Sequence, residues 1–385
     1  MRVDLPVAGG RLAPYTLNDP RKFEKPSRSF TRVAFAAAHV VADPLSEREP
    51  WLEPAIDWEA TLAYRRHLWS WGLGVAEAMD TAQRGMGLDW RSSLRLIGKS
   101  VDEAKSVPGA VVASGAGTDH MDLRGPISVE DVTAAYLHQI EAIEKLGGRI
   151  ILMASRALAA CARSPEDYGR VYDCILSQVK EPVIIHWLGE MFDPALQGYW
   201  GKRDHVEAMG VCLDILSRHS AKVDGIKISL LDKEKEILMR RRLPAGVRMY
   251  TGDDFHFAEL IEGDANGHSD ALLGIFDAIA PAASAALTAL AGNDRESFRS
   301  ILAPCVPLSR HIFKAPTRFY KTGIVFLAWL NGHQDHFVML GGQQSARHVR
   351  HFAELFRLAD AAGLLADPEL ACRRMNQLLA VHGIA

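Results

Sequence analysis

Short apolar runs rich in β-branched residues alternate along the chain with longer segments in which apolar residues recur at helical spacing. This alternation is typical of βα units built around a parallel sheet. Eight of the runs have the length and composition of strands, the last being the weakest. They span residues 32–38, 74–78, 110–114, 149–153, 183–187, 225–229, 247–251 and 267–271.

The number of strands indicates a closed barrel. Eight strands, each followed by a helix, suit a (β/α)8 barrel better than a doubly wound sheet, which usually has fewer strands and a glycine-rich first turn. Neither GxGxxG nor GxxxxGK[ST] occurs in the sequence, so a Rossmann or P-loop nucleotide site loses its main support. We therefore predict an α/β fold of the TIM-barrel class.

The pattern changes on either side of the barrel. Residues 1–30 are rich in proline, glycine and charge, which favours an extended N-terminal arm over a packed element. The barrel is expected to occupy residues 31–292. Residues 293–385 keep helical spacing without strand signals and are predicted to form a C-terminal helical region.

Composition and charge narrow the class of protein. Of the 385 residues 48% are hydrophobic and the formal net charge is -3, so the chain can bury a large core and lacks the basic excess of a nucleic-acid binder. The 5 cysteines are widely spaced without a CxxC pair, which argues against disulfides and zinc knuckles. No signal peptide or bilayer-spanning run is visible. We expect a soluble cytoplasmic protein without nucleic-acid or membrane partners.

Active sites of TIM barrels lie at the carboxyl ends of the strands. Polar residues follow nearly every predicted strand at that end. The candidates are Asp80 and Thr81 after the second strand, Asp119 after the third, Arg156 after the fourth, His186 in the fifth, Lys227 in the sixth, Asp253, Asp254 and His256 after the seventh, and His268 at the eighth.

Lys227 is a single cationic residue within the otherwise apolar strand 225–229. Such a lysine either reaches solvent or points into the barrel mouth. In a partly desolvated site a lysine has its pKa lowered, and the neutral amine can attack a carbonyl carbon to form a Schiff base.

The segment Gly225-Ile-Lys227, followed by Tyr250-Thr-Gly-Asp-Asp254, resembles the dihydrodipicolinate synthase and N-acetylneuraminate lyase superfamily. The order of helices and strands over residues 31–365 is similar as well. The resemblance implies a TIM barrel, a lyase reaction on a small carbonyl compound, and a Schiff base on Lys227.

Two departures from the family pattern bear on the chemistry. His186 stands where the family usually has a tyrosine that relays protons, and an imidazole can act as general acid or base near neutral pH. Asp80 and Thr81 correspond to the family's pair of threonines that binds a keto-acid carboxylate. Because Asp80 would repel such a carboxylate, a keto-sugar suits the site better than simple pyruvate.

The leading hypothesis is a class I aldolase-like lyase or dehydratase acting on a keto-sugar or keto-acid-like molecule. Lys227 would be the nucleophile, His186 would transfer protons and Thr81 would orient the substrate, without any cofactor. The residues expected to contact the substrate are Asp80, Asp119, Arg156, Asp253, Asp254, His256 and His268.

Two alternatives stay open. One is a divalent-metal-dependent lyase or isomerase, whose ligands would be His186, Asp253, His256 and His268. The other is a barrel without catalytic activity that binds a ligand.

A homo-oligomer, either a dimer or a tetramer, is also expected. The resembled family usually forms one, and the C-terminal helices carry more apolar residues than covering the barrel requires. These residues are Phe319, Ile324, Phe326, Trp329 and Phe337.

Overall fold

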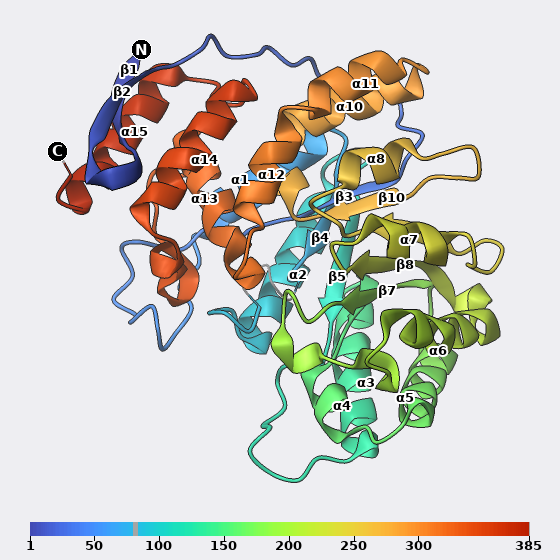
Figure 1. The fold of residues 1–385 in the computed structure, drawn as a ribbon. Helices are drawn as coiled ribbons and strands as arrows, with labels where there is room; N and C mark the ends of the chain where they lie inside the picture. Colours follow the sequence, from blue (N-terminus) through green and yellow to red (C-terminus); the bar gives the residue numbers. More distant parts are fainter. Residues whose placement is uncertain (80–83, 385) are drawn as a thin grey trace.

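The computed structural model describes residues 1–79 and 84–384. Within these residues, eight parallel strands close into a barrel in the order β10-β3-β4-β5-β6-β7-β8-β9 (Figure 1). The strands are β3 (Ala34–Ala37), β4 (Gly74–Glu77), β5 (Val112–Ala116), β6 (Arg149–Met153), β7 (Val183–Leu188), β8 (Val223–Ser229), β9 (Arg248–Thr251) and β10 (Asp270–Leu273). The predicted TIM-barrel fold is confirmed.

Side chains along each strand alternate between the barrel interior and the surrounding helices, as strand geometry requires. Phe35, Ile151 and Tyr250 belong to a small apolar group inside the barrel, which we call the interior cluster. Their strand neighbours Ala36 and Leu152 belong to the larger core between barrel and helices. Because both faces of these strands are buried, their sequences read as short continuous apolar runs.

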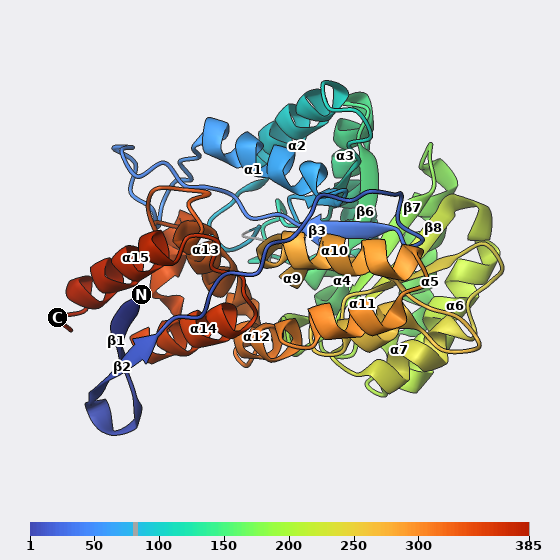
Figure 2. The same ribbon diagram turned by 90° about the horizontal axis from the view of Figure 1, so that it is seen from above.

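Helices follow the strands and surround the barrel (Figure 2). At the start of one of them, Ser128 and Asp131 form a capping box, in which each side chain satisfies a backbone N–H that the first turn leaves free. The helices of this layer are α1 (Trp58–Ser70), α2 (Trp90–Lys105), α3 (Val129–Lys145), α4 (Arg156–Cys161), α5 (Pro165–Gln178), α6 (His205–Arg218), α7 (Lys233–Arg240), α8 (Phe257–Glu262), α9 (Ile275–Ala278) and α10 (Ala280–Ala291).

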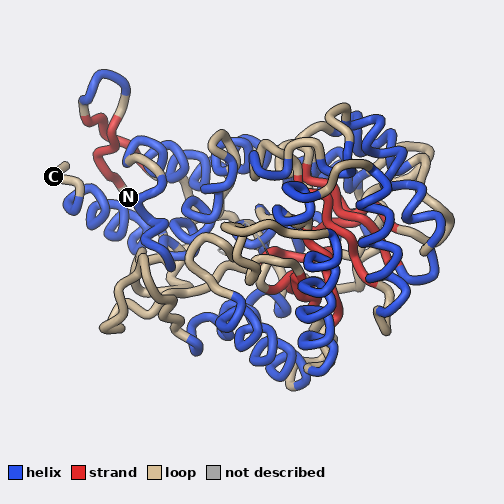
Figure 3. Tube along the Cα trace, turned by 90° about the horizontal axis from the view of Figure 1, so that it is seen from below, coloured by secondary structure: helices blue, strands red, loops and turns tan. Residues whose placement is uncertain are grey.

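The chain ends in a helical region beside the barrel (Figure 3). Its helices are α11 (Arg295–Leu302), α12 (Cys305–Ile312), α13 (Tyr320–Leu330), α14 (Val349–Ala361) and α15 (Pro368–Val381). The pattern did not predict α12, because Pro304 and Pro307 obscure its helical signal, although proline is tolerated in a first turn. None of the helices described is both long and apolar enough to cross a membrane.

α13 is buried along its whole length. Ile324, Phe326 and Trp329 lie in the core of the C-terminal region, at most 5% exposed. The apolar residues that contributed to the expectation of an oligomer are thus mainly used within the chain. They carry no argument for a subunit interface.

The first residues are folded rather than extended. β1 (Arg2–Pro6) and β2 (Leu12–Thr16) form an antiparallel hairpin, and β1 packs against α14 and α15. Val3 and Leu5, which alternate with polar residues, are buried. This two-residue alternation gives the hairpin an apolar face, and that is why it packs despite the surrounding prolines and glycines.

Candidate active site

Lys227 lies in β8 with its side chain on the inner face of the barrel. Its neighbours Ile226 and Ile228 belong to the outer core, whereas its partner on β9, Tyr250, belongs to the interior cluster. Lys227 is 7% exposed. A Cβ atom on Gly252 would come within 2.7 Å of Lys227 Cε, so the lysine side chain passes close to Gly252 at the end of β9.

His186 lies beside Lys227 on the adjacent strand. The two residues are directly paired between β7 and β8, and neighbouring strands are about 4.8 Å apart. His186 Nε2 is 3.1 Å from Ser229 Oγ, and Ser229 lies two residues beyond Lys227 on the same face of β8. The imidazole is buried, with His186 only 1% exposed.

Asp254 is a buried carboxyl group close to this pair. Its Oδ1 accepts a hydrogen bond from the backbone N–H of Ile275 at 2.8 Å. Burial raises the pKa of the Asp254 carboxyl to about 7, while Ile275 and the charges of Lys227 and Lys321 act in the opposite direction. Asp254 can therefore exchange a proton near neutral pH.

Asp253 and His256 organise the loop between β9 and α8. Asp253 Oδ1 accepts hydrogen bonds from the backbone N–H groups of Phe255 and His256, at 2.8 and 3.0 Å. Asp253 Oδ2 is 2.9 Å from His256 Nδ1. Both carboxylate oxygens of Asp253 thus have partners within the loop, and a contact of either residue with substrate stays a prediction.

His268 does not lie at the site. A turn closed by Asp264 and Gly267 delays the eighth strand, so His268 comes before β10 rather than at its carboxyl end. The neighbouring Asp270 accepts a hydrogen bond from the N–H of Val33, just before β3, which marks the amino end of the barrel. The prediction that His268 lies at the carboxyl ends of the strands is wrong.

The position of His268 also removes it from the group of four metal ligands proposed from the sequence. With His268 at the opposite end of the barrel, it cannot share a cation with His186. Within residues 1–79 and 84–384, no group of three or more His, Cys, Asp or Glu side chains is arranged to hold a metal ion.

The remaining candidates lie around the mouth of the barrel or outside the described residues. Asp119 follows β5 and accepts hydrogen bonds from Arg84, at 3.0 and 2.7 Å, and from Gln139 at 3.0 Å. Arg156 begins α4 and forms an ion pair with Asp193. Asp80 and Thr81 belong to residues 80–83, which lie outside the described part of the chain.

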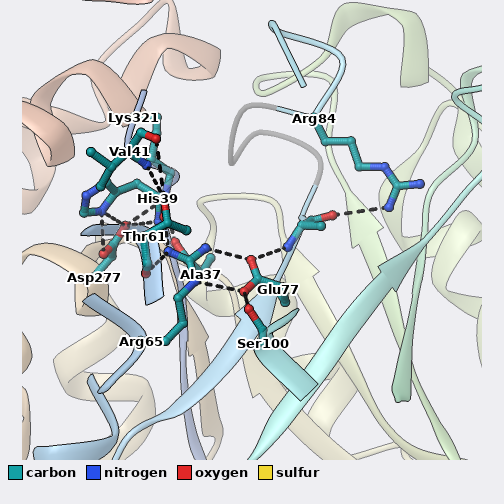
Figure 4. A network of polar contacts seen from close by, with 11 residues as sticks. Ala37, His39, Val41, Thr61, Arg65, Glu77, Arg84, Ser100, Asp277 and Lys321 are labelled. Carbon is teal, nitrogen blue, oxygen red and sulfur yellow. Dashed lines mark hydrogen bonds and ion pairs between the residues drawn. The ribbon is translucent and has the colours of Figure 1, made fainter. Parts of the chain in front are cut away.

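A buried ionic network near the ends of β3 and β4 was not found from the sequence (Figure 4). Asp277 accepts hydrogen bonds from Lys321 Nζ at 3.0 Å and from the backbone N–H of His39 at 2.8 Å. Burial opposes ionisation, but Lys321 and His39 hold the pKa of the Asp277 carboxyl well below its usual range. Lys321 also donates to the carbonyl of Ala37, so it ties α13 to β3.

The network continues through a second buried ion pair (Figure 4). Arg65 of α1 donates to both oxygens of Glu77, at 2.9 and 2.8 Å, and Ser100 Oγ donates to Glu77 at 2.5 Å. Glu77 and Lys321 are single charges within apolar segments. That signal, which drew attention to Lys227, would have identified them too.

Comparison with known proteins gives a family and a fold. The family described as "Protein of unknown function (DUF993)" matches residues 3–384. None of the curated proteins compared with the chain matches it.

The solved structures that are similar include several dihydrodipicolinate synthases. The enzyme from Aquifex aeolicus is 11% identical with a TM-score of 0.62, covering 92% of this chain and 98% of its own. The chloride-inhibited enzyme from Acinetobacter baumannii in complex with pyruvate is 15% identical with a TM-score of 0.61, covering 86% and 99%. The 4-hydroxy-tetrahydrodipicolinate synthase from Methylacidiphilum fumariolicum SolV is 13% identical with a TM-score of 0.63, covering 90% and 99%. The predicted resemblance is confirmed at the level of the fold.

Proposed function

The chain belongs to the DUF993 family of proteins of unknown function, and we propose that it is a class I aldolase-like lyase or dehydratase whose nucleophile is Lys227. The observation that carries the proposal is a buried lysine on the inner face of the barrel, paired with His186 on the adjacent strand. The dihydrodipicolinate synthase fold supports it at a coarser level.

In the proposed reaction the neutral amine of Lys227 adds to the carbonyl carbon of the substrate to give a carbinolamine, whose hydroxyl group takes up a proton and leaves as water to give an iminium ion. A base removes the proton of the β-hydroxyl group, and the bond between the α and β carbons breaks. The β carbon leaves as an aldehyde or ketone, and the electron pair of the broken bond is taken up by the iminium to give an enamine. Protonation of the enamine at the α carbon and hydrolysis release the product and restore the amine. In a dehydratase the α proton leaves instead and the β-hydroxyl departs as water.

Two buried groups are available for these proton transfers. His186 is paired with Lys227 and held by Ser229 Oγ at 3.1 Å. Asp254, whose carboxyl pKa burial raises to about 7, can accept a proton from a hydroxyl group and return it at neutral pH. We assign removal of the β-hydroxyl proton to His186. We assign proton exchange at the iminium nitrogen to Asp254, because the charge of Lys227 lowers the pKa of Asp254 and the two groups therefore lie near each other.

The proposal is tested by trapping the iminium with borohydride. We expect incubation with pyruvate, 2-oxoglutarate or fructose, followed by borohydride, to leave a covalent adduct on the peptide containing Lys227, found by mass spectrometry. Lys227→Ala should abolish the adduct while circular dichroism and thermal unfolding show a folded barrel. Lys180→Ala, which removes an exposed lysine before β7, is the matched control and should keep it.

An adduct on another lysine, or none with any of these carbonyl compounds, would contradict the proposal. Turnover of a carbonyl compound that leaves no adduct, is lost after treatment with a chelator and is restored by a divalent cation would favour the metal-dependent alternative. Binding of a carbonyl compound without any adduct would favour the ligand-binding barrel.

A further inference from the structure

Two adjoining cavities open at the carboxyl ends of the strands. The smaller, of about 130 Å³, is lined by residues that include Met153 of β6 and Arg156. The larger, of about 380 Å³, has walls from residues 84–87, the start of α4, the loop after β7 and the C-terminal helical region. Its volume is within the range of small-molecule sites. Both cavities share Arg84, Arg156 and Asp193.

The smaller cavity leads from the larger one toward the proposed reaction site. Met153 belongs to the interior cluster and is paired with His186 on β7, which is paired with Lys227 on β8. Met153 is therefore two strands from the lysine, a separation of about 10 Å. This separation is short enough for one small-molecule substrate to contact both Lys227 and the smaller cavity.

Positive charge dominates the wall of the larger cavity. Of the described residues, three arginines (Arg84, Arg156 and Arg318) and one carboxylate, Asp193, line this cavity. The arginines come from three distant parts of the chain, so their convergence is a product of the fold. A concave wall with charge of one sign attracts ions of the opposite sign.

The three arginines differ in what they can still bind. Arg84 donates to both oxygens of Asp119, at 3.0 and 2.7 Å, to Gln139, and to the carbonyls of Gly115 and Ala78. These contacts use the five donors of its guanidinium. Arg84 therefore shapes the wall and has no donor left for a ligand.

Arg156 and Arg318 keep donors for a ligand. Arg156 uses Nε for Asp193, and its side chain is 48% exposed. Arg318 rests over the ring of Phe319, with Cζ 4.9 Å from the ring centroid. Within the described residues, we find no carboxylate paired with Arg318 and no acceptor for the terminal nitrogens of Arg156.

We propose that the larger cavity is a subsite for an anionic group at the end of the substrate remote from the carbonyl, bound by Arg156 and Arg318. The inference rests on the proposed function for the identity of the reacting end, and it names the substrate class as a ketone with a terminal carboxylate or phosphate. Guanidinium groups bind both oxyanions through paired N–H donors.

Anion binding is measured first, because it does not require the lysine. Isothermal titration calorimetry at low ionic strength, where screening is weak, would use inorganic phosphate and succinate as probes. We expect Arg156→Gln and Arg318→Gln each to weaken binding by about ten-fold or more. Lys227→Ala should bind as the wild type does, and so should Arg350→Gln, which removes an exposed arginine of α14 outside the cavity. The tighter of the two probes identifies the terminal group.

The second measurement tests whether a distal anionic group on the substrate speeds adduct formation at Lys227. Borohydride trapping on Lys227 should be faster with 2-oxoglutarate than with 2-oxopentanoate, which lacks the distal carboxylate, or faster with fructose 6-phosphate than with fructose. Arg318→Gln should remove this preference, whereas Arg350→Gln, outside the cavity, should keep it and should trap the compound without the distal anionic group at the wild-type rate.

The outcomes separate the two proposals. Anion binding that depends on Arg156 and Arg318 without any adduct would leave the subsite standing and refute the Schiff base. Adducts that form equally with and without the distal anionic group, or anion binding that is unchanged in both arginine variants, would overturn the subsite and leave the proposed function intact.

Discussion

The side chains around Lys227 are titratable groups in apolar surroundings, and the space that each occupies is tightly limited. Gly252 shows how tightly. A Cβ at this position would lie 2.2 Å from Ser229 Oγ, 2.6 Å from the carbonyl oxygen of Ile228 and 2.7 Å from Lys227 Cε. The glycine of the Gly252-Asp-Asp254 segment is thus required by the passage of the lysine side chain and the adjacent strand.

We expect Gly252→Ala to lower the free energy of unfolding by about 1 to 3 kcal/mol, because the extra methyl group overpacks the strand ends. It should also reduce borohydride trapping on Lys227 by displacing its side chain. Urea denaturation and the trapping assay measure the two effects. Gly210→Ala in α6 is the control, since a Cβ there meets nothing within 4 Å. Equal stability of the two variants would contradict this explanation.

Helix α7 is joined to the barrel through a buried carboxyl group. Thr251 Oγ1 of β9 donates to Glu236 Oε2 at 2.9 Å, and Ser269 Oγ, just before β10, donates to Glu236 Oε1 at 2.7 Å. Burial is the largest influence and raises the pKa of Glu236 from 4.5 to about 8. The carboxyl group is therefore protonated at neutral pH in the folded protein.

This raised pKa makes stability depend on pH. The folded state keeps the Glu236 proton that the unfolded chain loses above pH 4.5, so this contribution to stability falls as pH rises from 4.5 to about 8. The loss amounts to at most about 1.4 kcal/mol per pH unit. Glu236→Gln removes the titration, and we expect its stability relative to wild type to increase with pH over this window.

Thermal unfolding or urea denaturation at several pH values would check this result. Glu234→Gln changes an exposed glutamate of the same helix and should follow the wild type throughout. If Glu236→Gln also follows the wild type at every pH, the carboxyl group is not protonated in the fold.

Asp360 of α14 connects the N-terminal segment to the C-terminal helical region. Asp360 of α14 accepts hydrogen bonds from Tyr15 Oη at 2.7 Å, from Asn18 Nδ2 at 2.7 Å and from the backbone N–H of Asn18 at 3.1 Å. The hairpin that these bonds anchor covers α14 and α15 (Figure 1). The N-terminal segment is therefore a structural part of the C-terminal region.

Asp360→Ala should lower the free energy of unfolding by about 1 to 3 kcal/mol, because it leaves donors without an acceptor. We expect amide exchange to rise first in β1 and β2, which hydrogen-exchange mass spectrometry can resolve. Asp19→Ala changes an exposed residue of the same segment and should leave exchange in the hairpin unchanged. Protection of the hairpin that survives Asp360→Ala would show that it is anchored by apolar packing and by the hydrogen bond from Arg357 to the carbonyl of Pro6.

The barrel could be predicted from the amino-acid pattern because strands buried on both faces produce local apolar runs. The run at 183–187 became β7 (Val183–Leu188). Lys227 could be identified in the same way, since a single charge in an apolar strand is visible without any tertiary contact. Boundaries were weaker, and a shift of the eighth strand moved His268 to the opposite end of the barrel.

The arrangement of the site depends on contacts between segments far apart in the chain. Whether Lys227 points inward was decided by barrel closure, which gives its strand an inner face shared with Tyr250. Closure and the packing of the C-terminal helices also bring Lys321 to Asp277 and place Arg318 on the wall of the same cavity as Arg156. Local periodicity depends on residues that are close in the sequence. These contacts, in contrast, form only when the sheet closes and the C-terminal helices pack against it.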